Sequence, residues 1–139
     1  MNNSRGNREI AIHYKNRKKM VYIFGADNIE SQNKIAGLTL QAILIDEASR
    51  CDKDFFLMAL SRLSEDEAKA FITTNPDNYS HWLKVDYIDN QRLKDNSKLG
   101  VWTFYLEDNK TLSEYYIQSI KEAYMGKPTE YARLIEANG

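Results

Sequence analysis

The 139-residue sequence has little of several features that would point to a special environment. Its single cysteine, Cys51, excludes a disulfide framework. No apolar run approaches the roughly 20 residues that a membrane-spanning helix needs, and residues 1–6 contain no apolar stretch that would suggest a secretory signal. The net charge of −1 indicates no general attraction to nucleic acid or membrane. These absences favour a protein of a reducing cytoplasm.

We interpret Cys51 as a structural cysteine. It lies near the start of a predicted helix, and this position would favour a lowered thiol pKa. The two histidines, His13 and His81, are far from each other and from Cys51 in the sequence. This spacing is not typical of a zinc site.

The most informative stretch covers residues 42–48, in which four apolar residues precede two acids. The short apolar run predicts a strand buried on both faces. The acids follow its carboxyl end, where open α/β sheets bind ligands. This pattern is typical of a Walker B motif, in which Asp46 would hold Mg²⁺ through water and Glu47 would polarise the attacking water. The alternative is a core strand followed by an ordinary helix start, because acids suit the positive end of a helix.

A second strand is expected to end at the same edge. Residues 52–63 show the apolar spacing of a helix with one buried face, and residues 70–74 predict a strand that ends at a turn. This βαβ order places the two strands parallel, so Thr73, Thr74 and Asn75 should lie beside the acid pair. There they would sense the γ-phosphate of a nucleotide. The alternative is that these residues are ordinary turn formers.

The start of the chain predicts a basic β-hairpin. Residues 9–14 and 20–24 predict two strands, and residues 15–19 predict the turn between them. Six basic residues occur in residues 1–19 against one acid, Glu9: Arg5, Arg8, Lys15, Arg17, Lys18 and Lys19. A basic loop is either solvated or contacts phosphates, and the candidate DNA contacts are Arg17, Lys18 and Lys19.

The remaining elements are expected from spacing and turn chemistry. A short helix over residues 29–35 would be capped by Asp27 or Asn28. The others are a polar surface loop over 89–99, a third strand over 101–106, a helix from Thr111 or Ser113 to about 124, a stop at Gly126 and Pro128, and a last helix over 129–136.

The order of these motifs resembles the ATPase domain of the large terminase subunit, the DNA-packaging motor of tailed bacteriophages. Residues 22–28 look like the strand and turn before that family's Walker B motif, residues 43–48 like the motif itself, and residues 60–63 like the Arg-Leu pair on the next helix. Residues 73–76 with 80–83 resemble the coupling motif, and residues 106–112 with 123–126 resemble the closing pattern. The combination of Thr-Thr-Asn-Pro, His81-Trp82 and Asp108-Asn109 favours terminases over other ATPases.

The resemblance covers residues 9–135 and implies an α/β fold. It implies a partial P-loop NTPase domain of the ASCE type over residues 1–139, with a mainly parallel sheet flanked by helices, an N-terminal hairpin over 9–24 and the remaining elements over 38–139. The complete protein would hydrolyse ATP with Mg²⁺ to move DNA. Its partners would be DNA, the small terminase subunit and the portal protein in the cytoplasm of the bacterial host, with no membrane.

The sequence departs from the family at one decisive point. It contains no Gly-x-x-x-x-Gly-Lys-Ser/Thr loop for the phosphates, and its nearest fragment, residues 126–128, has Pro128 where the metal-binding hydroxyl should be. The acidic cluster of the nuclease domain is also absent. We therefore expect the C-terminal part of a terminase ATPase domain, as a split gene product or a prophage remnant, whose partner would be the missing P-loop segment.

Two other functions remain open from the sequence. The chain would be a fragment of another helicase-like ATPase, or a non-catalytic protein that binds DNA or a phage partner through its basic hairpin. In either terminase or helicase, the P-loop strand would lie beside the strand over 70–74. Without it, that strand would have a bare edge, and we expect self-association, recruitment of a partner strand, or pairing with residues 101–106.

Overall fold

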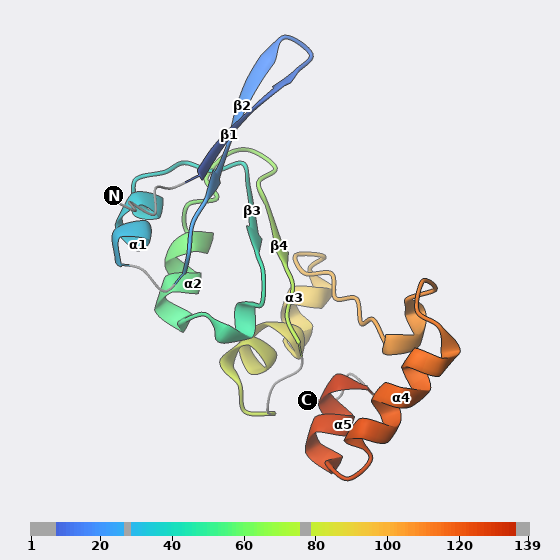
Figure 1. Cartoon of the computed structure of the whole chain (residues 1–139). Coiled ribbons are helices and arrows are strands. Elements are labelled where there is room, and N and C mark those ends of the chain that lie inside the picture. Colours follow the sequence, from blue (N-terminus) through green and yellow to red (C-terminus); the bar gives the residue numbers. More distant parts are fainter. Residues whose placement is uncertain (1–7, 27–28, 76–78, 136–139) are drawn as a thin grey trace. The chain divides into compact units, whose positions relative to one another are not determined.

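The computed structural model describes residues 8–26, 29–75 and 79–135 and has an α/β fold (Figure 1). It contains a hairpin of β1 (Arg8–Tyr14) and β2 (Arg17–Ile23) and a second two-stranded sheet of β3 (Ala42–Ile45) and β4 (Lys69–Ile72). Helices and short helical turns occupy the chain between and after these strands. None of the helices in the described ranges is long and apolar enough to cross a bilayer. The chain divides into two compact units, residues 1–43 with 51–71 and residues 44–50 with 72–139.

The predicted hairpin is confirmed, but its predicted five-residue turn is wrong. The two strands pair in register from Arg8 with Ile23 to Tyr14 with Arg17. The turn consists of Lys15 and Asn16, which have φ angles of 47° and 60°. Two left-handed residues in succession match the right-handed twist of the strands and close a hairpin in two residues. The basic residues that follow therefore belong to β2.

The β3–β4 pair is parallel, as the βαβ order predicts. The Lys69 N–H donates to Gln41 O at 3.1 Å, and the Thr73 N–H donates to Ile45 O at 3.0 Å. Both strands advance by four residues in the same direction between these bonds, which defines a parallel pair. The ladder continues past the end of both strands, because the Ala48 N–H donates to Thr73 O at 2.9 Å.

The prediction that the first of these strands is buried on both faces is wrong. Ile45 is buried, whereas Leu44 is 68% exposed. Phe71 on β4 is 58% exposed. Successive side chains of a strand point to opposite faces, so Leu44 lies on the face opposite to the buried Ile45. An apolar run indicates that both faces of a strand can be buried, but burial also requires other segments that pack against each face of the sheet.

Helix α2 (Lys53–Leu60) connects β3 to β4, and its start is set by a side-chain cap. The Asp52 carboxylate accepts from the Asp54 N–H at 2.8 Å, which satisfies a helix donor that would otherwise lack a partner. Phe55, Phe56 and Ala59 form its buried face, so the predicted apolar stripe is core. The helix ends at Leu60 rather than at residue 63.

Helix α1 (Ile29–Ala36) confirms the predicted short helix, while its predicted caps, Asp27 and Asn28, lie outside the described residues. Arg62 follows α2 and donates through Nη1 to Ala36 O at 2.8 Å. A cation at a helix C-terminus binds carbonyls that have no partner within the helix. Arg62, part of the Arg-Leu pair of the family resemblance, thus lies in a turn and ties the ends of α1 and α2 together.

Two predictions for the second half of the chain are wrong. The polar stretch over 89–99 contains the short helix α3 (Gln91–Asp95), whose Leu93 N–H donates to the capping Asn90 side chain at 3.3 Å. Residues 101–105 form no strand, and Trp102 and Phe104 are each 78% exposed. Their β-type composition predicts a strand, but a strand needs a paired neighbour, and none of the described segments pairs with them.

The last two helices are confirmed with different details. Helix α4 (Glu114–Tyr124) begins after Ser113, whose hydroxyl accepts from the Tyr116 N–H at 3.1 Å. It has no fully buried residue. Helix α5 (Pro128–Leu134) begins at Pro128, so this proline is the first residue of a helix as well as the stop after α4. Proline suits that position because the first helical N–H has no helical partner.

Candidate functional site

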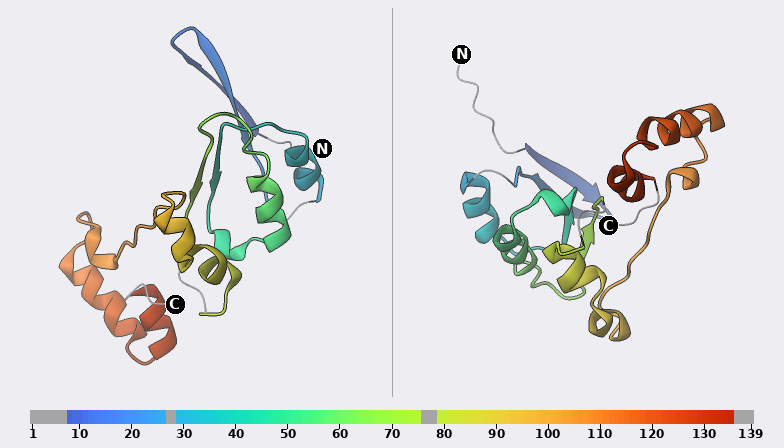
Figure 2. Two further views of the ribbon diagram at one scale, coloured as in Figure 1. Left: turned by 180° about the vertical axis from the view of Figure 1, so that it is seen from behind. Right: turned by 90° about the horizontal axis from the view of Figure 1, so that it is seen from below.

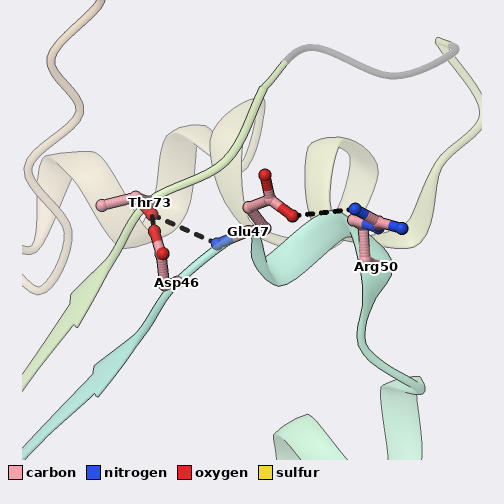
Figure 3. Close-up of polar contacts among 4 residues, drawn as sticks. All are labelled: Asp46, Glu47, Arg50 and Thr73. Atoms are coloured by element: carbon pink, nitrogen blue, oxygen red, sulfur yellow. Dashed lines mark hydrogen bonds and ion pairs between the residues drawn. The ribbon is translucent and has the colours of Figure 1, made fainter. Parts of the chain in front are cut away.

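The parallel pair brings Asp46 and Thr73 together at one sheet edge. Asp46 directly follows β3, and Thr73 directly follows β4. The Thr73 hydroxyl donates a hydrogen bond to Oδ1 of Asp46 (Figure 3). The backbone bonds on either side of Thr73 hold the two chain segments in this position. The structure therefore places these two predicted site residues in direct contact.

Thr73 also contacts the second acid through its backbone. The Glu47 N–H donates to the Thr73 Oγ1 at 3.2 Å, so one hydroxyl joins both residues of the acid pair. Glu47 has a φ of 50°, a left-handed conformation that is uncommon for a residue with a side chain. This conformation turns the chain sharply after Asp46 and allows the Glu47 N–H to reach Thr73.

The Glu47 carboxylate itself points away from Thr73 and toward Arg50 (Figure 3). Oε2 of Glu47 accepts from Nη1 of Arg50 at 3.1 Å. A 3₁₀ turn, η1 (Ala48–Arg50), places the two side chains side by side, and the fully buried Ala48 anchors that turn. The Arg50 and Glu47 side chains are 79% and 52% exposed. Water therefore screens the pair, and its net contribution to stability is small.

Sequence reasoning missed Arg50. The signal that was present is its spacing, because a basic residue three positions after an acid lies on the same side of a helical turn. The turn itself was not predicted, since the stretch from Asp46 to Cys51 has no helix periodicity. The contact thus depends on a short 3₁₀ turn that follows a left-handed residue.

The structure brings Thr74 and Asn75 to the same edge but not to the acids. The Thr74 hydroxyl donates to Asn75 O at 3.1 Å. Within the described ranges neither residue has a hydrogen bond to Asp46 or Glu47. Thr73 and Thr74 are successive in an extended chain, so their side chains point to opposite faces. Among the described residues, Thr73 is thus the one of the three predicted polar residues that has hydrogen bonds to the acid pair.

The donor set of this edge fits Mg²⁺ bound together with a nucleotide better than a metal cage made by the protein. Among the residues that the structure describes, no three carboxylate, imidazole or thiol side chains converge. Mg²⁺ commonly takes one or two protein carboxylates and completes its shell with water and phosphate oxygens. Asp46 uses Oδ1 for Thr73, and none of the described residues donates to its other oxygen, which is available for a metal-bound water.

The His81-Trp82 pair, part of the resemblance, has a packing role. The two rings lie 5.2 Å apart, and Nδ1 of His81 accepts from the Leu83 N–H at 3.2 Å. Leu83 is buried. Trp82 also meets Tyr87 edge to face at 6.4 Å within the π-helical turn η2 (Lys84–Ile88). These contacts order the turn before α3.

The structure disagrees with the alternative interpretation of Cys51, in which the helix start lowers its pKa. Burial raises the pKa of the Cys51 thiol, because a thiolate loses hydration inside the protein. The residue is partly buried and precedes the capping residue Asp52. Cys51 is thus a structural cysteine rather than an activated one.

The predicted DNA contacts Arg17, Lys18 and Lys19 lie on β2, next to the hairpin turn, and all three are exposed. Nζ of Lys19 donates to Oε1 of Gln41 at 2.6 Å. This bond ties the hairpin to the residue before β3. Both residues belong to the same compact unit.

Comparison with known proteins identifies the family. Residues 3–138 match the family model described as the phage terminase large subunit. A structure of the large terminase from a thermophilic bacteriophage matches with 31% identity and a TM-score of 0.81, over 95% of this chain and 33% of that chain. The same terminase in complex with ADP matches with 30% identity and a TM-score of 0.79, over 96% and 34%. Its complex with ATP-gamma-S matches with 31% identity and a TM-score of 0.72, over 96% and 32%.

No curated protein matches the sequence. The chain spans about a third of the length of the thermophilic phage terminase structures. The match of almost the whole chain to the family model agrees with the likeness of its fold to these structures. The chain belongs to the phage terminase large subunit family.

Proposed function

We propose that this chain forms the metal-binding and water-activating part of the ATPase site of a phage large terminase, the motor that packages viral DNA into the procapsid. The contact of Thr73 with both Asp46 and the Glu47 backbone carries the proposal. It joins the Asp46 carboxylate and the Glu47 backbone N–H to the end of β4, at the carboxyl ends of two parallel strands, where α/β proteins bind their ligands. The complexes of the thermophilic phage terminase with ADP and ATP-gamma-S support a nucleotide as the substrate.

Each residue has a distinct task in this proposal. Asp46 holds the metal-bound water, and Glu47 accepts the proton of the attacking water. Thr73 senses the γ-phosphate, since its hydroxyl is bonded to both acid positions and any shift of β4 moves them together. Thr74 and Asn75 are proposed to assist coupling from the same edge. Mg²⁺, when bound, neutralises charge on the phosphate oxygens during transfer.

The remaining parts of the motor are assigned by family. The phosphate-binding loop would come from the segment that precedes the hairpin in a complete terminase, because the sequence contains no Gly-x-x-x-x-Gly-Lys-Ser/Thr motif. DNA, the small terminase subunit and the portal protein are the proposed partners, in the cytoplasm of the infected bacterium. The family match favours a terminase over another helicase-like ATPase.

The test uses a chimera, namely the thermophilic phage terminase in which residues 8–135 of this chain replace the matching segment. Glu47→Gln should bind ATP with unchanged affinity and lower hydrolysis at least about 100-fold, because an amide accepts a proton poorly. Asp46→Asn should instead raise the Mg²⁺ concentration needed for hydrolysis. Arg92→Gln, a change at an exposed position of α3, is the control.

Two results would contradict the proposal. Hydrolysis by Glu47→Gln at the unmodified rate would remove Glu47 from the reaction. Equal effects of all three variants would mean that the measured activity reflects folding alone. The non-catalytic alternative predicts a different result. The chimera would then show a cooperative thermal melt, and would therefore be folded, but would hydrolyse no ATP, whereas the intact thermophilic phage terminase would.

A further inference from the structure

We propose that the tip of the β1–β2 hairpin is a binding site for duplex DNA, with Lys15, Arg17 and Lys18 as phosphate contacts. The inference rests on the proposed function in one respect, namely that DNA is the proposed substrate of the motor. It assigns the contact to one element of the chain. Figures 1 and 2 show that element as an arm that extends beyond α1 and α2.

Charge is concentrated at the tip of this arm. Four of the five residues from 15 to 19 are basic, whereas the whole chain has a net charge of −1. In the described part of the chain, no carboxylate forms an ion pair with Lys15, Arg17 or Lys18. The Nζ of Lys15 lies 5.2 Å from the centre of the Tyr14 ring. Neighbouring cations repel one another, and an anion bound at the tip offsets that repulsion.

The register of the hairpin distributes these cations over both faces. Residues paired across two antiparallel strands point to the same side. Arg17 pairs with Tyr14, and Lys19 pairs with Ile12, so both cations share one face. Lys18 pairs with His13 on the other face. Lys15 occupies the turn between them, so the tip presents positive charge in three directions.

This arrangement fits a groove with phosphates on both sides. The major groove of B-DNA is about 12 Å wide and about 8.5 Å deep and admits a two-stranded ribbon. The basic part of β2 covers three residues from the turn, Arg17 to Lys19, or about 10 Å at the rise of an antiparallel strand. A ribbon inserted to that depth brings Lys18 and Arg17 toward opposite phosphate backbones.

The stem of the hairpin has a different chemistry, which limits the site to the tip. Ile10, Val21 and Ile23 share the face of Arg17 but lie farther from the turn, and each is about half exposed. Lys19 is held to Gln41 at the border between the basic tip and this apolar stem. Along β2 the order from turn to base is therefore basic, then apolar, while Tyr14, His13 and Ile12 of β1 lie opposite the cations. This order suits an arm that meets DNA with its end.

The experiment measures binding of the 139-residue chain to a fluorescent duplex without nucleotide, so its outcome does not depend on ATP hydrolysis. The tip variant K15Q/R17Q/K18Q is compared with the control R92Q/K98Q/K110Q, which removes the same charge from exposed positions elsewhere. The tip variant should bind about tenfold or more weakly at ~0.1 M salt. Its plot of log affinity against log salt should become shallower by about 2 to 3 units, since each phosphate contact contributes about 0.9.

A second measurement uses the unmodified protein, so it does not depend on how a variant folds. Bound duplex should protect Lys15 and Lys18 from acetylation, with Lys98 as the unprotected reference. A single strand of the same sequence should protect them less, because it has no groove. Equal binding by the tip and control variants, or equal protection at all lysines, would overturn the proposal and favour an acidic protein surface as the partner of the tip.

Discussion

The guanidinium of Arg50 holds the carboxylate of Glu47 at 3.1 Å and turns it away from Thr73. In the proposed mechanism Glu47 must reach a water beside the γ-phosphate, so Arg50 competes with that water for the carboxylate. The pair is exposed and weak. It therefore biases the position of Glu47 without locking it.

Replacement of Arg50 tests this competition in the terminase chimera. Arg50→Gln should raise kcat by about two- to fivefold with KM unchanged, since an exposed ion pair contributes about 0–1 kcal/mol. Arg50→Lys keeps the charge and should stay near the original rate. A fall in kcat for Arg50→Gln would show that Arg50 holds Glu47 in its working position instead.

Thr73 and Thr74 form a matched pair for the second prediction. Thr73→Val removes the hydroxyl that bonds to Asp46 and to the Glu47 N–H, whereas Thr74→Val removes a bond to Asn75 O alone. Thr73→Val should lower hydrolysis by the chimera at least about tenfold and the free energy of unfolding of the 139-residue chain by about 1 kcal/mol. Thr74→Val should change both less. Phosphate release and urea titrations are the measurements, and equal effects would count against a special role for Thr73.

The third prediction concerns the 139-residue chain alone. It should release no phosphate from ATP above background, with or without DNA. Positioning contributes roughly 7–11 kcal/mol to such reactions, and the sequence contains no glycine-rich loop to hold the phosphates. The control is the Glu47→Gln chain. Turnover by the unmodified chain that disappears in this variant would reveal a phosphate-binding loop of another kind.

The fourth prediction concerns association of the isolated chain. Strand β4 pairs with β3 on one side, and no strand in the described ranges pairs with its other edge. Phe71 on this strand is 58% exposed. Sedimentation should show concentration-dependent association, and Phe71→Lys should reduce it, because a charge on an edge strand opposes pairing. Leu57→Lys, on an exposed position of α2, is the control, and a stable monomer at all concentrations would contradict the prediction.

The fifth prediction concerns Cys51. Because burial raises the pKa of its thiol, the thiolate forms at a higher pH in the folded chain than in the unfolded one. Alkylation of the native protein at pH 8 should therefore be slower than alkylation in urea, and the difference should narrow as the pH rises above the thiol pKa. Equal rates in both states would mean that Cys51 is not protected.

Local chemistry determined much of the fold and of the site. Asp52 and Ser113 begin their helices through caps that involve residues within three positions, so sequence reasoning located both helices. Thr73 lies 27 residues from Asp46, and its place beside that carboxylate was expected from the rule that the strands of a βαβ unit are parallel. The two caps depend on hydrogen bonds that a short segment carries within itself, and the strand order depends on the periodicities of successive segments.

Tertiary structure decided the rest. The exposure of Leu44 depends on which segments pack against its face of the sheet. In the same way, residues 101–105 can form a strand only where another strand pairs with them. The direction of the Glu47 carboxylate depends on a left-handed backbone that Thr73 stabilises from the neighbouring strand. A sequence pattern specifies what a segment is able to bury or bond, but only the folded chain supplies the partner.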